Sequence, residues 1–346
     1  MNNVSSLPEE IHVYRFPRWK WPVVRQCFPG RRVIFLTRAA DVPVHACLVL
    51  WGMAPVPEDL SVQAQIIRME DGFLRSVGLG ADLVRPLSWI MDKRGVYYDA
   101  TRPSDLEELL EAGACDESTL VRASALRSRI VAAGLTKYNV DTAVWQRPAN
   151  AGRVILVPGQ VESDASLAFG RPLVATNLGL LRMVREANPG AYVIYKPHPD
   201  VVARLRAEGK CEQQANLWCD EVVTSATMGD LLMAVDEVHV MTSLAGFEAL
   251  LRDKPVTCYG QPFYSGWGLT TDLVANSRRT RHLTLDELVA GVLIKYPFYL
   301  SRDGKRLLTP ELALDELLMW RERAGTATPW WRNIVRIFLR LIIGVR

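Results

Sequence analysis

The chain has 346 residues, of which 49% are apolar, and a formal net charge of +3. This length and apolar content favour two domains of ordinary size and exclude disorder over most of the chain. The small net charge gives no argument for nucleic acid as a partner.

The cysteines and the first residues indicate a cytoplasmic protein. The six cysteines are scattered and form no CxxC pair, as is typical of reduced thiols. The first residues, MNNVSSLPEE, lack the basic-then-apolar pattern of a signal peptide. No apolar run reaches the ~20 residues that span a bilayer.

The first half alternates short apolar runs with helix-like stretches. We expect strands at residues 32–37, 46–51, 65–69, 87–91 and 96–98, the last two as a hairpin or as edge strands. Ser104 is expected to cap a helix, with Glu107 in the capping-box position. A longer helix is expected at 120–134.

A second alternating series follows a linker predicted at 147–152, where Pro, Asn and Gly cluster. Strands are expected at 154–157, 191–195, 237–241 and 255–259, and helices at 180–187, 228–234, 244–252, 286–294 and 312–323. Two such series predict an α/β fold with two doubly wound, Rossmann-like domains facing a cleft. GT-B glycosyltransferases have this architecture, as do many other proteins. The expected parts are an acceptor-side domain over 1–146, a nucleotide-sugar domain over 153–305, a closing helix over 306–327 and an amphipathic helix over 328–346.

The last segment, 330–346, contains four arginines and no acidic residue. Arg332, Arg336 and Arg340 recur at i, i+4 and share one helical face, while apolar residues occupy the other. This pattern is typical of a helix lying in an anionic membrane surface with tryptophans at headgroup depth. The alternative is a terminal helix packed on the protein or on a partner.

Two predicted strand ends carry groups that suit a phosphate. Thr242 or Ser243 stands at the N-cap of the helix after strand 237–241, where hydroxyls and backbone N–H groups make an anion site. Lys196 and His198 project from a loop stiffened by two prolines, although YKPHPD also suits a plain surface turn. Together with a Gly- and aromatic-rich loop at the same edge, these groups predict a nucleotide-type ligand.

Further polar candidates follow the strand at 154–157. The loop VPGQVESDAS leaves it through Pro-Gly, so Gln160, Glu162 and Asp164 are expected at the cleft. Asp164 also suits an N-cap for the next helix. Glu248, about one and a half turns into its helix, is either a ligand of ribose hydroxyls or a solvated residue.

The run EDGFLRS follows a strand of the first domain. Glu70 and Asp71 are adjacent and point in different directions, so one of them is expected to face the cleft. Arg75 suits a bidentate contact to a substrate carboxylate; the alternative is an Asp-Gly turn with a structural Glu–Arg pair. The sequence has no Asp-x-Asp, HExxH, GxxxxGK[ST] or GxSxG motif, so metal-held nucleotide chemistry is not expected.

Taken together, eight motifs in order resemble the retaining β-Kdo transferases of bacterial capsule biosynthesis, the KpsC type. They run from about Glu70 to about Arg302 and are EDGFLRSVGLG, YYDATRPSDLE, LTKYN, VPGQVESDAS, YKPHPD, TSLAGFEALLRDKPV, GQPFYSGWGLT and YPFYL. The resemblance implies a GT-B-like fold, CMP-Kdo as donor, no metal cofactor and a β-linked Kdo product on a glycolipid acceptor.

The resemblance also implies roles for single residues. Retention implies double displacement with Asp164 as nucleophile, and Glu70 is the candidate acid/base ahead of Asp71. The donor would be held by Gln160, Lys196, His198, Thr242, Ser243, Glu248 and Arg75, with Arg75 at the Kdo carboxylate.

One feature departs from the family. Its best-known capsule enzymes carry two such modules in one chain, whereas this sequence has one, so it would add a single Kdo or act beside another transferase. The expected partners are CMP-Kdo, a glycolipid or oligosaccharide acceptor, the inner-membrane surface and other capsule biosynthesis proteins, but no nucleic acid. The alternatives are a transferase for another CMP-sugar and a non-catalytic GT-B module in a polysaccharide assembly complex.

Overall fold

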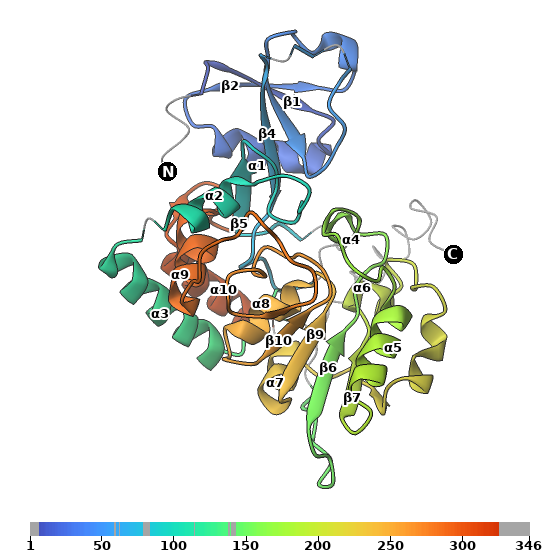
Figure 1. Ribbon diagram of the computed structural model, residues 1–346. Coiled ribbons are helices and arrows are strands. Elements are labelled where there is room, and N and C mark those ends of the chain that lie inside the picture. The colour runs from blue at the N-terminus through green and yellow to red at the C-terminus, as the bar shows by residue number, and fades with distance from the viewer. Residues whose placement is uncertain are drawn as a thin grey trace.

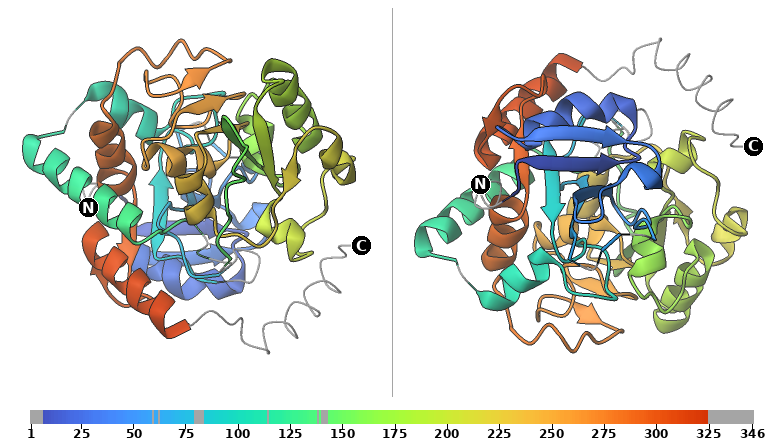
Figure 2. Two further views of the ribbon diagram at one scale, coloured as in Figure 1. Left: turned by 90° about the horizontal axis from the view of Figure 1, so that it is seen from below. Right: turned by 90° about the horizontal axis from the view of Figure 1, so that it is seen from above.

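Two β-sheets with surrounding helices form two adjoining lobes in the computed structural model (Figures 1 and 2). The structure describes residues 7–324 except 59, 62, 79–83, 114, 138 and 140–142. The amphipathic helix predicted at 328–346 therefore lies outside the described residues. Within the described part of the chain, every helix is too short or too polar to cross a bilayer.

The first sheet has seven strands in the order β13-β12-β5-β4-β3-β1-β2. They are β1 (Glu10–Tyr14), β2 (Arg32–Leu36), β3 (Cys47–Trp51), β4 (Gln65–Asp71), β5 (Ser88–Asp92), β12 (Phe298–Leu300) and β13 (Leu307–Leu308). Strands β1 to β4 pair in parallel, and β5 is antiparallel to both β4 and β12. The strands predicted at 32–37, 46–51 and 65–69 are confirmed, whereas β1 was not predicted because its apolar run is short and interrupted by His12.

The strand predicted at 96–98 is absent, and this prediction is wrong. The buried Asp92 carboxylate instead accepts hydrogen bonds from the backbone N–H groups of Arg94 at 2.9 Å and Gly95 at 2.8 Å. Its other oxygen accepts from the N–H of Asp105 at 2.9 Å. These bonds turn the chain directly after β5, so β5 pairs with β12 rather than with a following strand.

The chain returns to the first sheet near its end. Strand β12 pairs antiparallel with β5 and β13, and Tyr299 and Leu300 are buried there. Helix α10 (Pro310–Ala324) packs on β12, β13 and α3 (Glu117–Ala132). Residues 298–308 thus lie in the first sheet, which differs from the expected division that placed 153–305 in a single second domain.

The second sheet has six parallel strands in the order β11-β10-β9-β6-β7-β8. They are β6 (Val154–Pro158), β7 (Tyr192–Lys196), β8 (Glu221–Val222), β9 (Glu237–Val240), β10 (Val256–Cys258) and β11 (Thr271–Asp272). All four strands predicted for this half are confirmed. Every residue of β6 is buried, as expected for a parallel strand covered on both faces. Because the strands are parallel, the polar loops after them meet at one edge.

Further helices connect the strands. They are α1 (Trp21–Cys27), α2 (Asp105–Ala112), α4 (Ala165–Phe169), α5 (Asn177–Ala187), α6 (Pro199–Val202), α7 (Met228–Ala234), α8 (Leu244–Leu250) and α9 (Leu285–Val289), with short turns η1 (Arg18–Lys20), η2 (Ala39–Asp41), η4 (Glu212–Leu217) and the π-helical η5 (Ala290–Lys295). Ser104 caps α2 by accepting the N–H of Glu107 at 3.1 Å. The predicted capping box is only half formed, because the Glu107 carboxylate binds Arg278 and Arg279 instead.

The two lobes share their largest apolar core. One cluster of buried side chains contains Ile90 from β5 and Leu156 from β6, together with residues of α3, α7, α8 and α10. Figure 2 shows the helices α3 and α10 side by side at one edge of the molecule. The fold is therefore a mixed α/β structure in which two sheets with parallel strands are joined through a common interior.

Candidate active site

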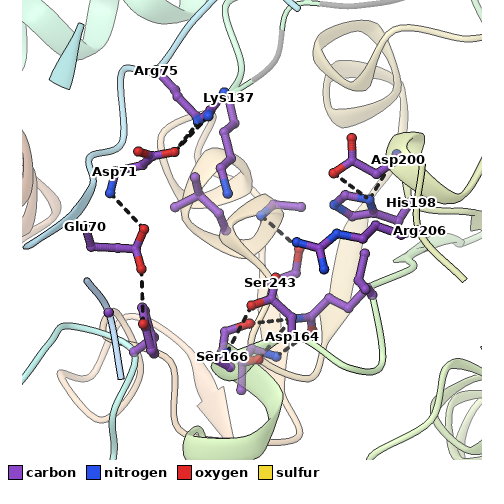
Figure 3. Close-up of a pocket in the computed structure, with 18 of the residues that line it drawn as sticks. Glu70, Asp71, Arg75, Lys137, Asp164, Ser166, His198, Asp200, Arg206 and Ser243 are labelled. Carbon is purple, nitrogen blue, oxygen red and sulfur yellow. Dashed lines mark hydrogen bonds and ion pairs between the residues drawn. The ribbon is translucent and has the colours of Figure 1, made fainter. Parts of the chain in front are cut away.

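A cavity of about 900 Å³ lies at the carboxyl ends of β4, β6, β7 and β9, with walls from both lobes. The ten side chains with a predicted catalytic or donor-binding role all line the cavity, and Figure 3 shows several of them around the opening. They are Glu70, Asp71, Arg75, Gln160, Asp164, Lys196, His198, Thr242, Ser243 and Glu248. This volume is within the range of pockets that bind small molecules and cofactors. Glu162, which was also expected at the cleft, is not part of the lining; its carboxylate accepts the backbone N–H groups of Asn177 and Lys210 at 2.8 Å.

Glu70 and Asp71 both line the cavity, although strand alternation predicts that only one of them does. Strand β4 ends at Asp71, and the chain then turns at Gly72. Gly72 packs so closely on Ser88 that a Cβ would lie 1.7 Å from the Ser88 Oγ. The alternation therefore stops at this turn, and the expectation of a single cleft-facing carboxylate is wrong.

Arg75 binds Asp71. Its Nε and Nη2 atoms lie 2.8 Å from Asp71 Oδ2, and Arg75 is buried. Lys20 adds a second cation, with its Nζ 3.7 Å from Asp71 Oδ1. The guanidinium predicted for a ligand carboxylate is thus engaged by a carboxylate of the protein, and the structural pair is Asp–Arg rather than Glu–Arg.

The two adjacent carboxyls have opposite pKa shifts. Burial, together with the neighbouring Asp71 charge, raises the pKa of Glu70 to about 7. Burial acts on Asp71 as well, but Arg75 and Lys20 outweigh it and hold the pKa of Asp71 below its ordinary value. Glu70 accepts hydrogen bonds from the Asp71 N–H at 2.9 Å and the Tyr98 hydroxyl at 3.1 Å. Glu70 can therefore exchange a proton near neutral pH, whereas Asp71 stays ionised.

Gln160 and Thr242 fix two loops to each other. The Gln160 Nε2 donates to Thr242 Oγ1 at 3.0 Å, and the Thr242 N–H donates to Gln160 Oε1 at 3.0 Å. Asn177 completes the arrangement by exchanging hydrogen bonds of 2.9 and 2.8 Å with the Gln160 backbone. The polar atoms of both side chains are thus occupied within the protein, and their contribution is to hold the loops after β6 and β9 in register.

Lys196 and His198 follow β7 and differ in what they offer a ligand. The buried Lys196 donates from Nζ to the carbonyl of Ala226 at 2.7 Å. His198 caps α6, and its Nδ1 accepts the backbone N–H of Asp200 at 3.1 Å. Burial, with the charges of Lys137 and Arg206, lowers the pKa of His198 to about 3. His198 is therefore neutral near pH 7 and offers a hydrogen bond rather than a charge.

Asp164 and Ser243 stand at helix starts on the second-lobe side of the cavity (Figure 3). Asp164 is exposed and caps α4 by accepting the Ser166 N–H at 3.4 Å. Ser243 caps α8 by accepting the Ala245 N–H at 3.3 Å, and its carbonyl accepts the Tyr264 hydroxyl. The N-cap alternative for Asp164 is thus present in the structure and leaves its carboxylate at the cavity surface.

Glu248 is buried rather than solvated. Its Oε1 accepts the backbone N–H of Lys137 at 2.6 Å, and burial raises the pKa of Glu248 to about 7. Lys137 and Arg206 were not predicted as site residues, yet both line the cavity. Figure 3 shows Lys137 between the Asp71 side and the His198 side. Lys137 belongs to the motif LTKYN, so the motif itself was the available signal.

An aromatic and basic wall was also missed by sequence reasoning. Trp19, Lys20 and Trp51 line the cavity on the first-lobe side. The Lys20 Nζ lies 2.7 Å from the centroid of the Trp51 ring, and burial lowers the pKa of Lys20 to about 8. The run RWKW, which mixes cations and indoles, was the signal for this wall. Across the residues that the structure describes, no group of three or more His, Cys, Asp or Glu side chains is placed to hold a metal ion.

The family model for capsule polysaccharide biosynthesis proteins matches residues 56–127 and 119–299. The chain belongs to this family. It is 47% identical over 324 residues to the capsule polysaccharide modification protein LipA of Neisseria meningitidis serogroup B, covering 91% of this chain and 46% of LipA. It is 43% identical over 298 residues to the lipopolysaccharide-processing protein LpsZ of Rhizobium meliloti, covering 81% of this chain and 68% of LpsZ. The chain thus spans about half the length of LipA.

Two solved structures from Thermosulfurimonas dismutans share the fold. The KpsC β-Kdo 2,7 transferase is 39% identical with a TM-score of 0.76, over 90% of this chain and 99% of that one. The KpsC β-Kdo 2,4 transferase is 29% identical with a TM-score of 0.78, over 91% and 99%. The resemblance to the KpsC type is confirmed.

Proposed function

We propose that the protein is a retaining glycosyltransferase that moves β-Kdo from CMP-Kdo to a glycolipid or Kdo-bearing acceptor in capsule or surface polysaccharide biosynthesis. The observation that carries the proposal is the convergence of the ten side chains with a predicted catalytic or donor-binding role on one cavity between two lobes. Kdo transferases of the same fold and the family membership support the reaction class. In this proposal the two lobes act as the two halves of a GT-B enzyme.

The second lobe would hold the nucleotide. The N-terminal turn of α8 offers the Ser243 hydroxyl and backbone N–H groups, and the neutral His198 offers its Nε2–H. Lys137 and Arg206 place positive charge near the same region, as their effect on His198 indicates. These groups would stabilise the phosphate that develops charge as CMP leaves, with no metal ion assigned to the step. Glu248 would receive the ribose hydroxyls.

Asp164 and Glu70 would have different roles in the two steps of the reaction. In the first step an Asp164 oxygen attacks the anomeric carbon, the bond to the CMP phosphate breaks, and CMP leaves with the electron pair. In the second step the acceptor hydroxyl attacks the same carbon, the bond to Asp164 breaks, and the hydroxyl proton passes to Glu70. A pKa of about 7 suits Glu70 for this proton transfer at neutral pH. The ion pair with Arg75 makes Asp71 the weaker base.

Two other functions make different predictions. A transferase for another CMP-sugar would use the same phosphate groups but turn over a different donor. A non-catalytic module would bind a partner and tolerate loss of Asp164. The cavity of about 900 Å³ with a proton-exchanging carboxyl favours an enzyme over such a module.

The test is incubation with CMP-Kdo generated in situ and a Kdo-bearing or lipid-like acceptor, with CMP and glycosyl product both measured. Transfer is expected, and Asp164→Ala should abolish it while CMP still binds. Turnover of another CMP-sugar alone would exclude CMP-Kdo as donor, and full activity of Asp164→Ala would remove Asp164 from the nucleophile role. Association with the inner-membrane surface is tested separately: truncation after Thr328 should move the protein from membranes to the soluble fraction.

A further inference from the structure

Asp71 has one carboxylate oxygen left without a hydrogen-bond partner. Its Oδ2 is bound by Arg75, whereas the buried Oδ1 accepts no hydrogen bond from the part of the chain that the structure describes. Lys20 is near this oxygen at 3.7 Å, which is an ion-pair distance but longer than a hydrogen bond. A buried acceptor without a donor is unfavourable, so this oxygen at the cavity wall is suited to a ligand hydroxyl.

Lys20 is held close to that oxygen by indole rings. Its Nζ lies 2.7 Å from the centroid of the Trp51 ring, 5.1 Å from that of Trp19 and 5.7 Å from that of Trp89. These rings attract the ammonium charge, but they accept no strong hydrogen bonds from its three donors. The Lys20 side chain is only 8% exposed, so the ammonium is fixed in place before a ligand arrives.

The charges around Asp71 favour an anionic group of the ligand. Lys20, Arg75 and Lys137 contribute three positive charges near Asp71, against one negative charge on Asp71 and one on Glu70 when it is ionised. At least one positive charge is then left over in a wall with little access to water. A carboxylate would balance it and would form a charge-assisted hydrogen bond with the ammonium.

The same wall is next to the expected proton acceptor. Glu70 directly precedes Asp71, and both line the cavity. In the proposed reaction the acceptor hydroxyl must reach Glu70, so the sugar that bears this hydroxyl has to lie against the wall formed by Asp71 and Lys20. The groups on that wall therefore contact the acceptor rather than the nucleotide.

We propose that Lys20 and Asp71 form the subsite for an acidic sugar at the end of the acceptor, in which Lys20 binds its carboxylate and Asp71 Oδ1 accepts one of its hydroxyls. This inference rests on the proposed function and adds the residues that select the acceptor. Asp71 thereby moves from the predicted chemistry to acceptor recognition. The indoles of Trp19 and Trp51 keep water from the ion pair.

The test compares a Kdo-terminated acceptor with its methyl ester in the wild-type protein and in Lys20→Gln. The wild type should show a KM at least about tenfold lower for the acid, the size expected for a charge-assisted hydrogen bond. Lys20→Gln should lose this preference, and Lys20→Arg should keep most of it. This comparison is a double-mutant cycle between one protein group and one ligand group, so a purely structural role of Lys20 would not remove the preference.

The exposed Lys305 provides the matched control, because Lys305→Gln removes the same charge outside the cavity lining and should retain the preference. Equal KM values for acid and ester in the wild type would overturn the inference without any variant. A preference for the acid that persists in Lys20→Gln would also overturn the inference. In either case, transfer of Kdo by the wild type would leave the proposed function standing. Absence of any transfer from CMP-Kdo by the wild type would instead overturn the proposed function, and this inference with it.

Discussion

The Nδ1 atom of His198 lies 3.1 Å from the backbone nitrogen of Asp200 and accepts its hydrogen. This bond assigns the ring proton to Nε2, because the neutral imidazole carries one proton. The lowered pKa of about 3 keeps the ring in this state at all pH values near neutrality. A donor phosphate would therefore meet the same N–H group throughout that range.

We expect His198→Asn to remove an acid sensitivity of folding. Because the pKa of His198 is lowered to about 3 in the folded state, the unfolded chain binds a proton below the ordinary value of 6.5 and the folded chain does not. The free energy of unfolding is therefore highest above pH 6.5 and falls as the pH drops toward 3. At pH 5 it is lower by about 2 kcal/mol. An asparagine side chain can also cap α6, so the fold should be retained. Urea unfolding of both proteins at pH 8 and pH 5 measures the difference.

His45 is exposed and provides the control for this prediction. His45→Asn should leave the loss between pH 8 and pH 5 as it is in the wild type. If His198→Asn loses as much stability as the wild type between pH 8 and pH 5, the prediction that His198 is buried as a neutral ring is wrong.

Glu248→Gln should stabilise the protein, and more so at alkaline pH. The pKa of Glu248 is raised to about 7, so the folded state binds a proton that the unfolded chain releases from about 4.5 upward. The loss in free energy of unfolding caused by Glu248 grows between pH 4.5 and pH 7 and reaches at most about 3 kcal/mol above pH 7. Glutamine keeps an oxygen that can accept the Lys137 N–H, so the change removes mainly the ionisation. Urea unfolding at pH 5 and pH 8 should show the larger gain at pH 8.

The exposed Glu322 supplies the comparison, because Glu322→Gln removes one carboxylate from the surface. That variant should change stability by less than about 0.5 kcal/mol at either pH. An equal gain for Glu248→Gln at both pH values would contradict the raised pKa of Glu248.

Glu70→Gln should separate the two chemical steps. In the proposed reaction Glu70 must be ionised to accept the proton of the acceptor hydroxyl, so wild-type transfer should rise as pH passes about 7 and then level off. Glutamine cannot take the proton, and transfer should fall on the order of 10²–10⁴-fold. CMP release is not directly dependent on Glu70, so the glycosyl adduct on Asp164 should accumulate and be detected by intact-protein mass spectrometry. Wild-type transfer rates in Glu70→Gln would assign the proton to another group.

Gly52→Ala should impair activity more than stability. Gly52 has φ +49°, and a Cβ there would lie 2.7 Å from the Tyr98 hydroxyl and 2.9 Å from Glu70 Oε2. The methyl group would displace the Tyr98 hydroxyl and the Glu70 carboxyl, which are hydrogen-bonded to each other. Gly30 is the matched control, because its φ is +74° and nothing lies within 4 Å of a Cβ. Both alanine variants should lose about 1 kcal/mol of stability, but only Gly52→Ala should lose transfer activity. Equal activities would contradict the role of this contact.

Sequence patterns predicted the elements whose burial repeats regularly. The parallel strands of the second sheet are continuous apolar runs. Strand β6 is buried throughout, so its position could be predicted from the sequence pattern. Strand β12 could not be assigned to its sheet, because pairing with β5 joins residues about two hundred positions apart and no local pattern encodes that contact. The false strand at 96–98 failed for a related reason, since the turn depends on the buried carboxylate of Asp92.

The candidate site was predicted in position more accurately than in detail. Polar loops after parallel strands meet at one edge, which is why the ten residues with a predicted catalytic or donor-binding role line the cavity. Their partners depend on tertiary geometry. Gln160 is bound by Thr242, Arg75 by Asp71, and Lys196 by a backbone carbonyl. The orientations of these three side chains therefore do not follow from their sequence neighbours alone.

The shared core has a consequence for how the protein unfolds. Ile90 and Leu156 belong to one apolar cluster although their strands lie in different sheets, and α10 packs against the first sheet after the chain has completed the second. Opening either lobe would expose apolar surface of the other. The molecule should therefore melt in one cooperative transition rather than as two independent units, and a lobe excised from the chain would lack part of its own interior.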